Sequence, residues 1–145
     1  MTVVLDLDGT LNNCDHRQQH ARNGDWNKFH SALMDDEPNP DVLWFVRMIE
    51  EEHPIIGCTG RNEAFRPLTY KWLDRHQIKL DAILMRPDGD YTPDAKLKPA
   101  MLEEFFRSKE EVLKQVRFVV DDRDRVVEAW RNYGLFCWQC RPGSY

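Results

Sequence analysis

The chain has 145 residues, of which 31% are charged and 41% are hydrophobic, and its formal net charge is −5. This length predicts one domain, and the composition excludes a disordered chain because enough apolar residues are present to form a core. The excess of acidic residues argues against a protein that coats long stretches of nucleic-acid backbone, although it is compatible with a local basic pocket.

The sequence predicts a cytoplasmic protein with no membrane partner. No apolar run approaches the roughly 18 residues of a membrane-spanning helix, and the chain enters the run Val3-Val4-Leu5 without a basic leader. Of the four cysteines only Cys137 and Cys140 have the spacing of a pair, and a zinc ribbon would need a second pair. We therefore expect reduced, partly buried thiols.

Short apolar runs alternate with longer stretches of helical periodicity, an order that is typical of α/β proteins with a parallel sheet. After a first strand over residues 3–7, residues 12–38 interrupt the alternation with one short helix that carries Trp26, Phe29 and Leu33. We interpret this segment as a cap-like insertion beside the carboxyl ends of the strands. Further strands are predicted over residues 54–59, 82–85, 117–120 and 135–140, and apolar stripes predict helices around residues 42–49, 68–73, 102–106 and 126–130.

The first strand ends in Asp6-Leu7-Asp8-Gly9-Thr10-Leu11. Two acids one residue apart in extended chain point to the same face, and Gly9 allows the chain to turn away directly after them. Carboxylates this close repel each other, so we expect a bound cation or a shared proton. Because the ligands are oxygen atoms, Mg²⁺ is the predicted cation. An isolated pattern of this kind is equally typical of a solvated loop or a helix cap.

A second pair of acids, Asp121 and Asp122, follows the apolar run Val119-Val120 and precedes a helical stretch. Three or four carboxylates are thus predicted to meet at neighbouring strand ends, which structural need alone does not explain. Asp122 has an alternative explanation as a helix cap, whereas Asp121 is harder to explain without a function.

Groups suited to phosphate occur at two further points. The apolar run that begins at Ile55 ends in Thr59-Gly60-Arg61, and this hydroxyl, flexible residue and guanidinium can grip phosphate oxygens. Lys98-Pro99 is predicted to open a helix, which would place a cation at an anion-favouring helix start. Taken separately, Thr59 and Lys98 would be ordinary surface residues.

These four segments, in this order, resemble the four motifs of the haloacid dehalogenase (HAD) superfamily of phosphotransferases, and the resemblance spans nearly the whole chain. It implies a Rossmann-like three-layer α/β/α fold with a central, mostly parallel five-stranded sheet and a very small cap. It also implies one HAD-type phosphatase domain over residues 1–145, with the cap-like insertion at about residues 12–38.

The resemblance assigns chemistry to particular residues. It implies that Asp6 is the nucleophile that forms an aspartyl-phosphate and that Asp8 protonates the leaving oxygen and later deprotonates water. Thr59 and Lys98 would hold the transferring phosphoryl oxygens. An aspartate two residues after the nucleophile favours phosphatases over dehalogenases. Mg²⁺ would be bound by Asp6, the backbone carbonyl of Asp8 and the pair Asp121 and Asp122.

The chain also resembles the 3′-phosphatase domain of bacteriophage polynucleotide kinase, through residues 120–139 and Lys71-Trp72. By this likeness Arg17 and Arg86 are substrate-gripping arginines and Asp94 is an important acid; without it, both arginines would be solvated surface charges. Gly60 and Arg61 complete the expected substrate-binding set.

Two features depart from that enzyme. The P-loop pattern GxxxxGK[ST] is absent, so this chain is expected to be at most the phosphatase part. The insertion also differs: Trp26 and Phe29 could stack on a base, but their helical spacing favours core packing. His16 and His20 share a helix face without a third metal ligand, which favours a solvated or capping role.

We therefore predict a Mg²⁺-dependent phosphomonoesterase whose substrate is a nucleotide or, by preference, a 3′-phosphate end of DNA or RNA. The alternatives are a nucleoside monophosphate phosphatase and a catalytically idle phosphate-binding module. The net negative charge favours the small substrate, whereas the arginines and an open crevice favour a polynucleotide end. A separate kinase or ligase partner is left open.

Overall fold

The centre of the fold is a parallel sheet of five strands. The computed structural model describes all 145 residues, and the strands lie in the order β5-β4-β1-β6-β7 with every neighbouring pair parallel. The predicted α/β class and the five strands are confirmed. Their bounds are β1 (Thr2–Leu5), β4 (Ile55–Asn62), β5 (Ala82–Arg86), β6 (Val116–Asp121) and β7 (Cys137–Gln139).

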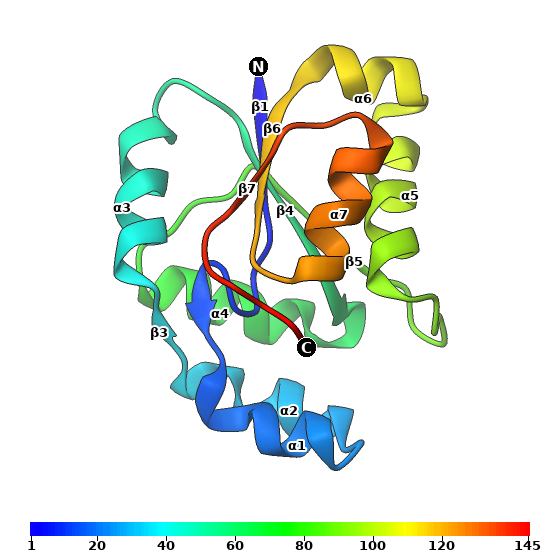
Figure 1. Cartoon of the computed structure of the whole chain (residues 1–145). Helices are drawn as coiled ribbons and strands as arrows, with labels where there is room; N and C mark the ends of the chain where they lie inside the picture. Colours follow the sequence, from blue (N-terminus) through cyan, green and yellow to red (C-terminus); the bar gives the residue numbers. More distant parts are fainter.

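Helices cover both faces of this sheet (Figure 1). On one face Val46 of α3 (Pro40–Ile49) shares an apolar core with Leu5 of β1, and α4 (Arg66–Arg75) packs against the same core. On the other face Leu102 shares a second core with Val4, and this layer consists of α5 (Asp94–Phe106), α6 (Lys109–Gln115) and α7 (Asp124–Tyr133). Successive residues of β1 thus face opposite cores, as the two-residue period of a strand requires. The three-layer arrangement is the one that the sequence predicted.

The insertion forms a small lobe below the carboxyl ends of the strands in Figure 1. Its ends are joined by a short antiparallel pair, β2 (Asn12–Asn13) with β3 (Glu37–Pro38). We predicted one helix here, whereas the structure has α1 (Gln18–Arg22) and α2 (Trp26–Ser31), each continuous with a 3-10 turn. The two helices separate because Gly24 has a positive φ of 73° and Asp25 then caps α2 by accepting a hydrogen bond from the Lys28 amide.

Helix α5 begins earlier than predicted. It begins at Asp94, so Lys98 lies in its second turn and not at the helix start, and Pro99 lies inside the helix. The prediction treated Pro99 as a first-turn residue, the position that proline favours. An internal proline removes one backbone hydrogen bond, and the burial of Met101 and Leu102 on the same helix outweighs that loss.

Three further differences from the sequence prediction concern β1, α6 and β4. Strand β1 ends at Leu5, two residues before its predicted end at residue 7. Helix α6 was not predicted; Ser108 caps it by accepting a hydrogen bond from the Glu111 amide. Strand β4 continues three residues past its predicted end, with an irregular register beside β5 between Thr59 and Asn62. This extension carries Gly60 and Arg61 on the strand itself.

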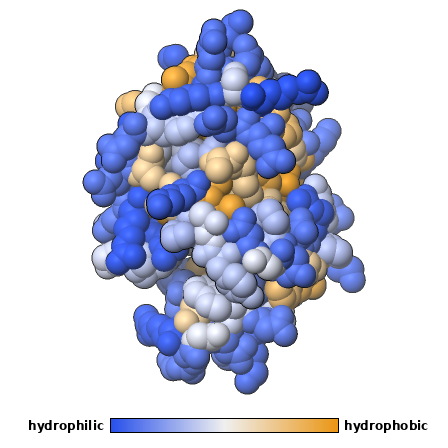
Figure 2. All heavy atoms as spheres, turned by 90° about the vertical axis from the view of Figure 1, so that its right-hand side faces the viewer, coloured by the Kyte–Doolittle hydropathy of each residue, from blue (hydrophilic) through white to orange (hydrophobic).

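The surface agrees with the composition. Figure 2 shows the face covered by α5, α6 and α7 as mostly hydrophilic, with apolar atoms gathered near its middle. Phe105 on α5, which we expected to face the core, is exposed, as is Leu113 on α6.

All four cysteines are free, three of them buried and Cys140 exposed. None of the helices has both the length and the apolar character that a membrane crossing requires.

Candidate active site

Three buried carboxylates meet where β1 and β6 end. Because these strands pair in register, with Leu5 opposite Val120, Asp6 follows β1 at the same level as Asp121 and Asp122. One carboxylate oxygen from each of the three acids lies within 4.8 Å of the others, and all three residues are at least 96% buried. The convergence of the two acidic strand ends is therefore confirmed as geometry.

Lys98 lies among these acids. Its Nζ donates to Asp6 Oδ1 at 2.7 Å and to Asp121 Oδ2 at 2.9 Å, and its side chain is 3% exposed. Burial and repulsion from Asp121 raise the pKa of Asp6 well above its ordinary value, against the attraction of Lys98. Burial acts to lower the pKa of Lys98, but Asp121 and Asp6 raise it well above its usual value. With all three carboxylates ionised, they and the one ammonium group carry a formal charge of −2 in a buried space.

The carboxylate cluster fits a hard divalent cation. Its potential ligands are oxygen atoms, which suit Mg²⁺, and its uncompensated charge matches that of one such ion. The Asp8 carboxylate is not part of this cluster and is directed at two arginines instead. Any contribution of Asp8 to a metal ion would have to come from its backbone carbonyl. This is the Asp8 atom that the resemblance to the HAD motifs implies as a metal ligand.

Asp8 is held by Arg17 from the insertion and by Arg61 from β4. Arg61 Nη2 donates to Asp8 Oδ1 at 2.5 Å and Arg61 Nε to Asp8 Oδ2 at 3.3 Å, and Arg17 Nη2 donates to Asp8 Oδ1. Burial alone would raise the pKa of Asp8, but these two guanidinium groups hold it well below its usual range. Asp8 is therefore a stable anion in this structure.

Arg17 is fully buried, so its alternative interpretation as a solvated surface charge is wrong. Asp36, at the far end of the insertion, accepts from Arg17 Nε at 2.9 Å and from Arg17 Nη2 at 2.7 Å. Arg17 Nη1 donates to the Phe29 carbonyl at 2.9 Å, and its guanidinium lies 4.3 Å from the Phe29 ring centroid. Asp36 also pairs with His16 Nε2 at 2.6 Å. These contacts fix Arg17 against Asp8.

Replacing Asp36 by alanine is expected to destabilise the protein by about 3 kcal/mol and to lower turnover, because it removes the bidentate partner of a buried guanidinium. Chemical denaturation and the rate of phosphate release measure the two effects. Asp35→Ala is the matched control, since Asp35 is the exposed neighbour. Equal, small effects of the two substitutions would contradict the positioning role of Asp36.

Arg86, Asp94 and Gly60 form another side of the site. Arg86 Nη2 donates to Asp94 Oδ1 at 2.5 Å and Arg86 Nε to the Gly60 carbonyl at 2.8 Å, while Asp94 Oδ2 accepts from Arg123 Nη1 at 3.2 Å. A Cβ atom at position 60 would lie 2.3 Å from Asp94 Oδ1. Glycine is therefore required at this position for Asp94 to approach the strand. Arg86 is only partly available to a ligand, because its side chain is 17% exposed and bonded to the loop before α5.

One cavity of about 610 Å³ joins these groups. Arg17 is the only predicted site residue outside its lining, because it lies behind Asp8. Thr59, which is 1% exposed, accepts a hydrogen bond from the Arg61 amide at 3.1 Å. The residues that line the cavity as predicted are Asp6, Asp8, Thr59, Gly60, Arg61, Arg86, Asp94, Lys98, Asp121 and Asp122.

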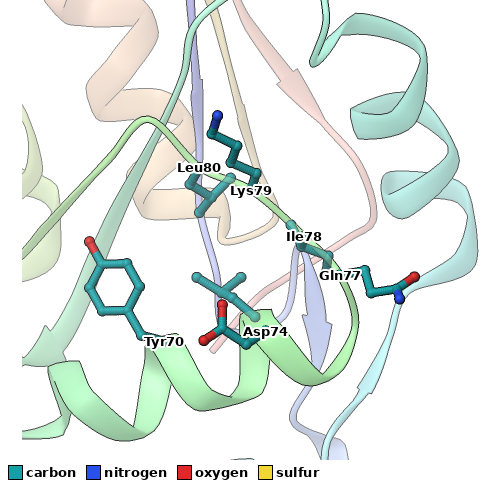
Figure 3. A pocket seen from close by; sticks show the side chains of 7 residues that line it. Tyr70, Asp74, Gln77, Ile78, Lys79 and Leu80 are labelled. Carbon is teal, nitrogen blue, oxygen red and sulfur yellow. The ribbon is translucent and has the colours of Figure 1, made fainter.

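A second hollow, of about 370 Å³, lies at the end of α4 (Figure 3). Tyr70 and Asp74 from the helix and Leu80 from the following segment line it. It contains no cluster of acids and no predicted site residue, so the site is the cavity at the strand ends.

Sequence reasoning missed several supporting residues. The buried Thr10 hydroxyl is 2.9 Å from Asp6 Oδ2 and 3.3 Å from Asp122 Oδ1, and Trp130 Nε1 donates to Asp121 Oδ2 at 3.2 Å. Tyr145 donates its hydroxyl to Asp122 Oδ2. Thr10 stands within the first acidic motif and could have been noticed there. Trp130 and Tyr145 are distant in sequence and carry no local signal.

The same fold occurs in solved HAD-like hydrolases. A haloacid dehalogenase-like hydrolase from Streptococcus pneumoniae matches 95% of this chain and 83% of its own, with a TM-score of 0.67 and 12% identity. At that identity the likeness shows the fold alone. The fold is therefore that of HAD-like hydrolases.

The family follows from the sequence model of the polynucleotide kinase PNKP phosphatase domain, which matches residues 1–145. The chain belongs to this family and is a phosphatase of the HAD superfamily.

Two further relatives are longer than this chain. A chain of the solved Pnkp1/Rnl/Hen1 complex is 30% identical with a TM-score of 0.83, and the match covers 99% of this chain and 46% of that one. A protein of Autographa californica nuclear polyhedrosis virus, described as a bifunctional polynucleotide kinase/RNA ligase, is 29% identical over 90% of this chain and 18% of its own length. The chain thus spans less than half the length of these relatives.

Proposed function

We propose that the chain is a Mg²⁺-dependent polynucleotide 3′-phosphatase that acts through an aspartyl-phosphate on Asp6. The observation that carries the proposal is the shared cavity, in which Asp6, Lys98 and the pair Asp121 and Asp122 adjoin the arginine-bound Asp8. A nucleophile, a countercharge and a proton-transfer group are then available to one phosphoryl group.

In the first step the Asp6 carboxylate attacks phosphorus, the new bond joins an Asp6 oxygen to phosphorus, and the bond from phosphorus to the 3′-oxygen breaks. Asp8 gives a proton to that 3′-oxygen. In the second step Asp8 takes a proton from water, whose oxygen displaces Asp6 and yields inorganic phosphate. Lys98 and the Thr59 hydroxyl would stabilise charge on the transferring oxygens.

The arginines couple Asp8 to the substrate. Arg17 and Arg61 hold Asp8 as an anion, the form that the second step requires. For the first step, Arg61 would transfer hydrogen bonds from Asp8 to the phosphoryl oxygens, so that Asp8 can carry a proton. Gly60, Arg86 and Asp94 would shape the wall along which the substrate enters.

Asp6, Asp121 and Asp122, together with the Asp8 carbonyl, would hold Mg²⁺, which when bound supplies neutralisation of the phosphoryl dianion. Each of the three carboxylates already accepts a hydrogen bond from the protein. Asp6 accepts from Lys98 and from Thr10, Asp121 accepts from Lys98, and Asp122 accepts from Tyr145. These contacts keep the ligand atoms together without the ion.

The names of the relatives support the polynucleotide substrate and its context. One solved relative belongs to an RNA repair complex, and the viral relative is described as a kinase and RNA ligase. We therefore place this phosphatase beside kinase and ligase activities that process the same broken ends. RNA is the first substrate to test, followed by DNA.

A substrate panel tests the proposal. With Mg²⁺, kcat/KM is measured for 3′-phosphorylated RNA and DNA, for the same strands with a 5′-phosphate, and for a nucleoside 3′-monophosphate. The 3′-phosphorylated strand is expected to exceed the mononucleotide by about tenfold or more, which is about 1.4 kcal/mol of transition-state binding.

Two results would contradict the proposal. A preference for the mononucleotide by more than about tenfold would assign a nucleotidase instead. Phosphate release no faster than that of an Asp6→Asn variant would leave a phosphate-binding module without catalysis.

A further inference from the structure

Part of the cavity lining is aromatic and uncharged. Trp26 and His30 from α2 and Phe65 from the 3-10 turn Glu63–Phe65 line the cavity together. We call these three residues the aromatic wall. The cationic residues of the lining lie elsewhere, on β4, β5, α5 and the start of α7: Arg61, Arg86, Lys98, Arg123 and Arg125.

The aromatic wall is continuous. The His30 ring centroid lies 5.1 Å from that of Phe65 and 6.3 Å from that of Trp26. Phe29 also lines the cavity and adjoins the wall, with its ring centroid 5.6 Å from that of Trp26 and 5.2 Å from that of His30, and it is buried. Trp26 itself remains 56% exposed. The sequence treated Trp26 and Phe29 as one pair, but only Phe29 packs in the interior, so Trp26 is available to a ligand.

His30 contains a polar atom without a partner. The residue is 92% buried, and its Nδ1 atom is buried and forms no hydrogen bond. Burial lowers the pKa of His30 to about 4, so the imidazole is neutral near pH 7 and offers one donor and one acceptor. Because the Nδ1 atom is itself buried, His30 contributes to the wall as a neutral aromatic ring.

The aromatic wall lies next to the reacting groups. The Arg17 guanidinium contacts Asp8 on one side and lies 4.3 Å from the Phe29 ring centroid on the other. Phe29 is in turn in contact with Trp26 and His30. The aromatic wall and the reacting groups Asp6 and Asp8 therefore line one cavity.

We propose that Trp26, His30 and Phe65 form a subsite for the nucleobase of the terminal nucleotide, the one whose phosphate reaches Asp6. This inference rests on the proposed phosphatase function and deepens it. A flat, neutral aromatic group matches an uncharged aromatic wall. Stacking of this kind accepts any base, because every base has a π-face.

The test compares two substrates that differ only in the terminal base. Both are 3′-phosphorylated oligonucleotides, one with a natural terminal nucleotide and one with an abasic tetrahydrofuran residue at that position. For the wild type, kcat/KM is expected to be about tenfold higher with the base. Trp26→Ala should bring this ratio close to one, and Trp26→Phe should retain most of it. Phe65→Ala should lower it as well.

Trp44→Ala is the matched control, because Trp44 on α3 is 66% exposed and does not line the cavity. It should leave the ratio unchanged. Circular dichroism confirms that each variant is folded. A wild-type ratio near one, or a ratio that Trp26→Ala does not change, would overturn the subsite.

A binding measurement separates this inference from the proposed function. The affinity of an Asp6→Asn variant for fluorescent copies of the two oligonucleotides needs no turnover. If the wild type hydrolyses neither oligonucleotide nor an aryl phosphate, the proposed function fails. Tighter binding of the strand with the base, lost when Trp26→Ala is added, would still support the subsite, and equal binding of both strands would exclude it.

Discussion

An Asp6→Asn variant is expected to lose phosphatase activity by about 10⁴-fold or more, while its thermal stability without metal stays equal to that of the wild type or rises. An amide oxygen is a poor nucleophile at phosphorus, so the covalent step is lost. In the wild type, repulsion from the neighbouring carboxylates raises the pKa of Asp6. The substitution removes one of these three buried like charges and so relieves the repulsion. Phosphate release and calorimetry measure the two effects separately.

Asp41→Asn makes the same chemical change outside the site. Asp41 is an exposed residue in the first turn of α3, so its substitution should change neither activity nor melting temperature appreciably. Mg²⁺ should raise the melting temperature of the wild type and of Asp41→Asn more than that of Asp6→Asn, because the last variant lacks one charged ligand. Activity of Asp6→Asn within tenfold of the wild type would rule out Asp6 as the nucleophile.

A Lys98→Met variant is expected to be destabilised by about 3 kcal/mol at pH 8 without metal, because it leaves three buried carboxylates without a countercharge. Methionine keeps the length of the apolar stem, so the loss reports on the charge. Turnover should also fall steeply, because the phosphoryl oxygens lose their cation. Denaturation curves at several pH values measure the effect on stability.

The loss of stability should depend on pH in a definite direction. In the folded protein the pKa of Asp6 lies above the ordinary value of 3.8, so as pH rises through the interval between these values the unfolded state releases its proton first. The contribution of Asp6 to the free energy of unfolding therefore falls as pH rises through this interval. Without Lys98 the folded pKa moves further up, so Lys98→Met should be closer to the wild type at pH 5 than at pH 8.

Lys96→Met provides the control, because Lys96 is an exposed residue on the same helix. It should match the wild type at both pH values. Mg²⁺ should restore part of the stability of Lys98→Met at pH 8, since an added cation supplies the missing charge. A pH-independent loss that Mg²⁺ does not reduce would mean that Lys98 acts through packing.

The acidic cluster could be predicted because each acid directly follows an apolar strand. Parallel strands end at one edge of a sheet, so Asp6 and Asp121 had to be near each other once β1 and β6 were neighbours. The helix start at Lys98 was predicted wrongly, because Pro99 mimicked a first-turn residue. Lys98 still reaches Asp6, because a lysine side chain in the second turn is long enough to reach the strand ends.

The arginine network could not be read from local patterns. Arg17 and Asp36 are paired through the closure of the insertion, a contact across 19 residues that no spacing rule specifies. A short polar segment suggests solvated charges, whereas the structure buries both side chains. The different exposures of Trp26 and Phe29, three residues apart on one helix, likewise depend on what packs beside α2.

The two-residue pair β2 with β3 makes the insertion a separable cassette. Asn12 stands opposite Pro38, so the segment leaves and rejoins the sheet-bearing body at one point, and its length can change at little cost in loop-closure entropy. The Arg17 link to Asp8 sets one condition on such an exchange, and the packing of Leu33 in the main core sets another. A donor segment grafted between these positions would have to bring its own guanidinium with an acidic partner and an apolar residue that fills the place of Leu33.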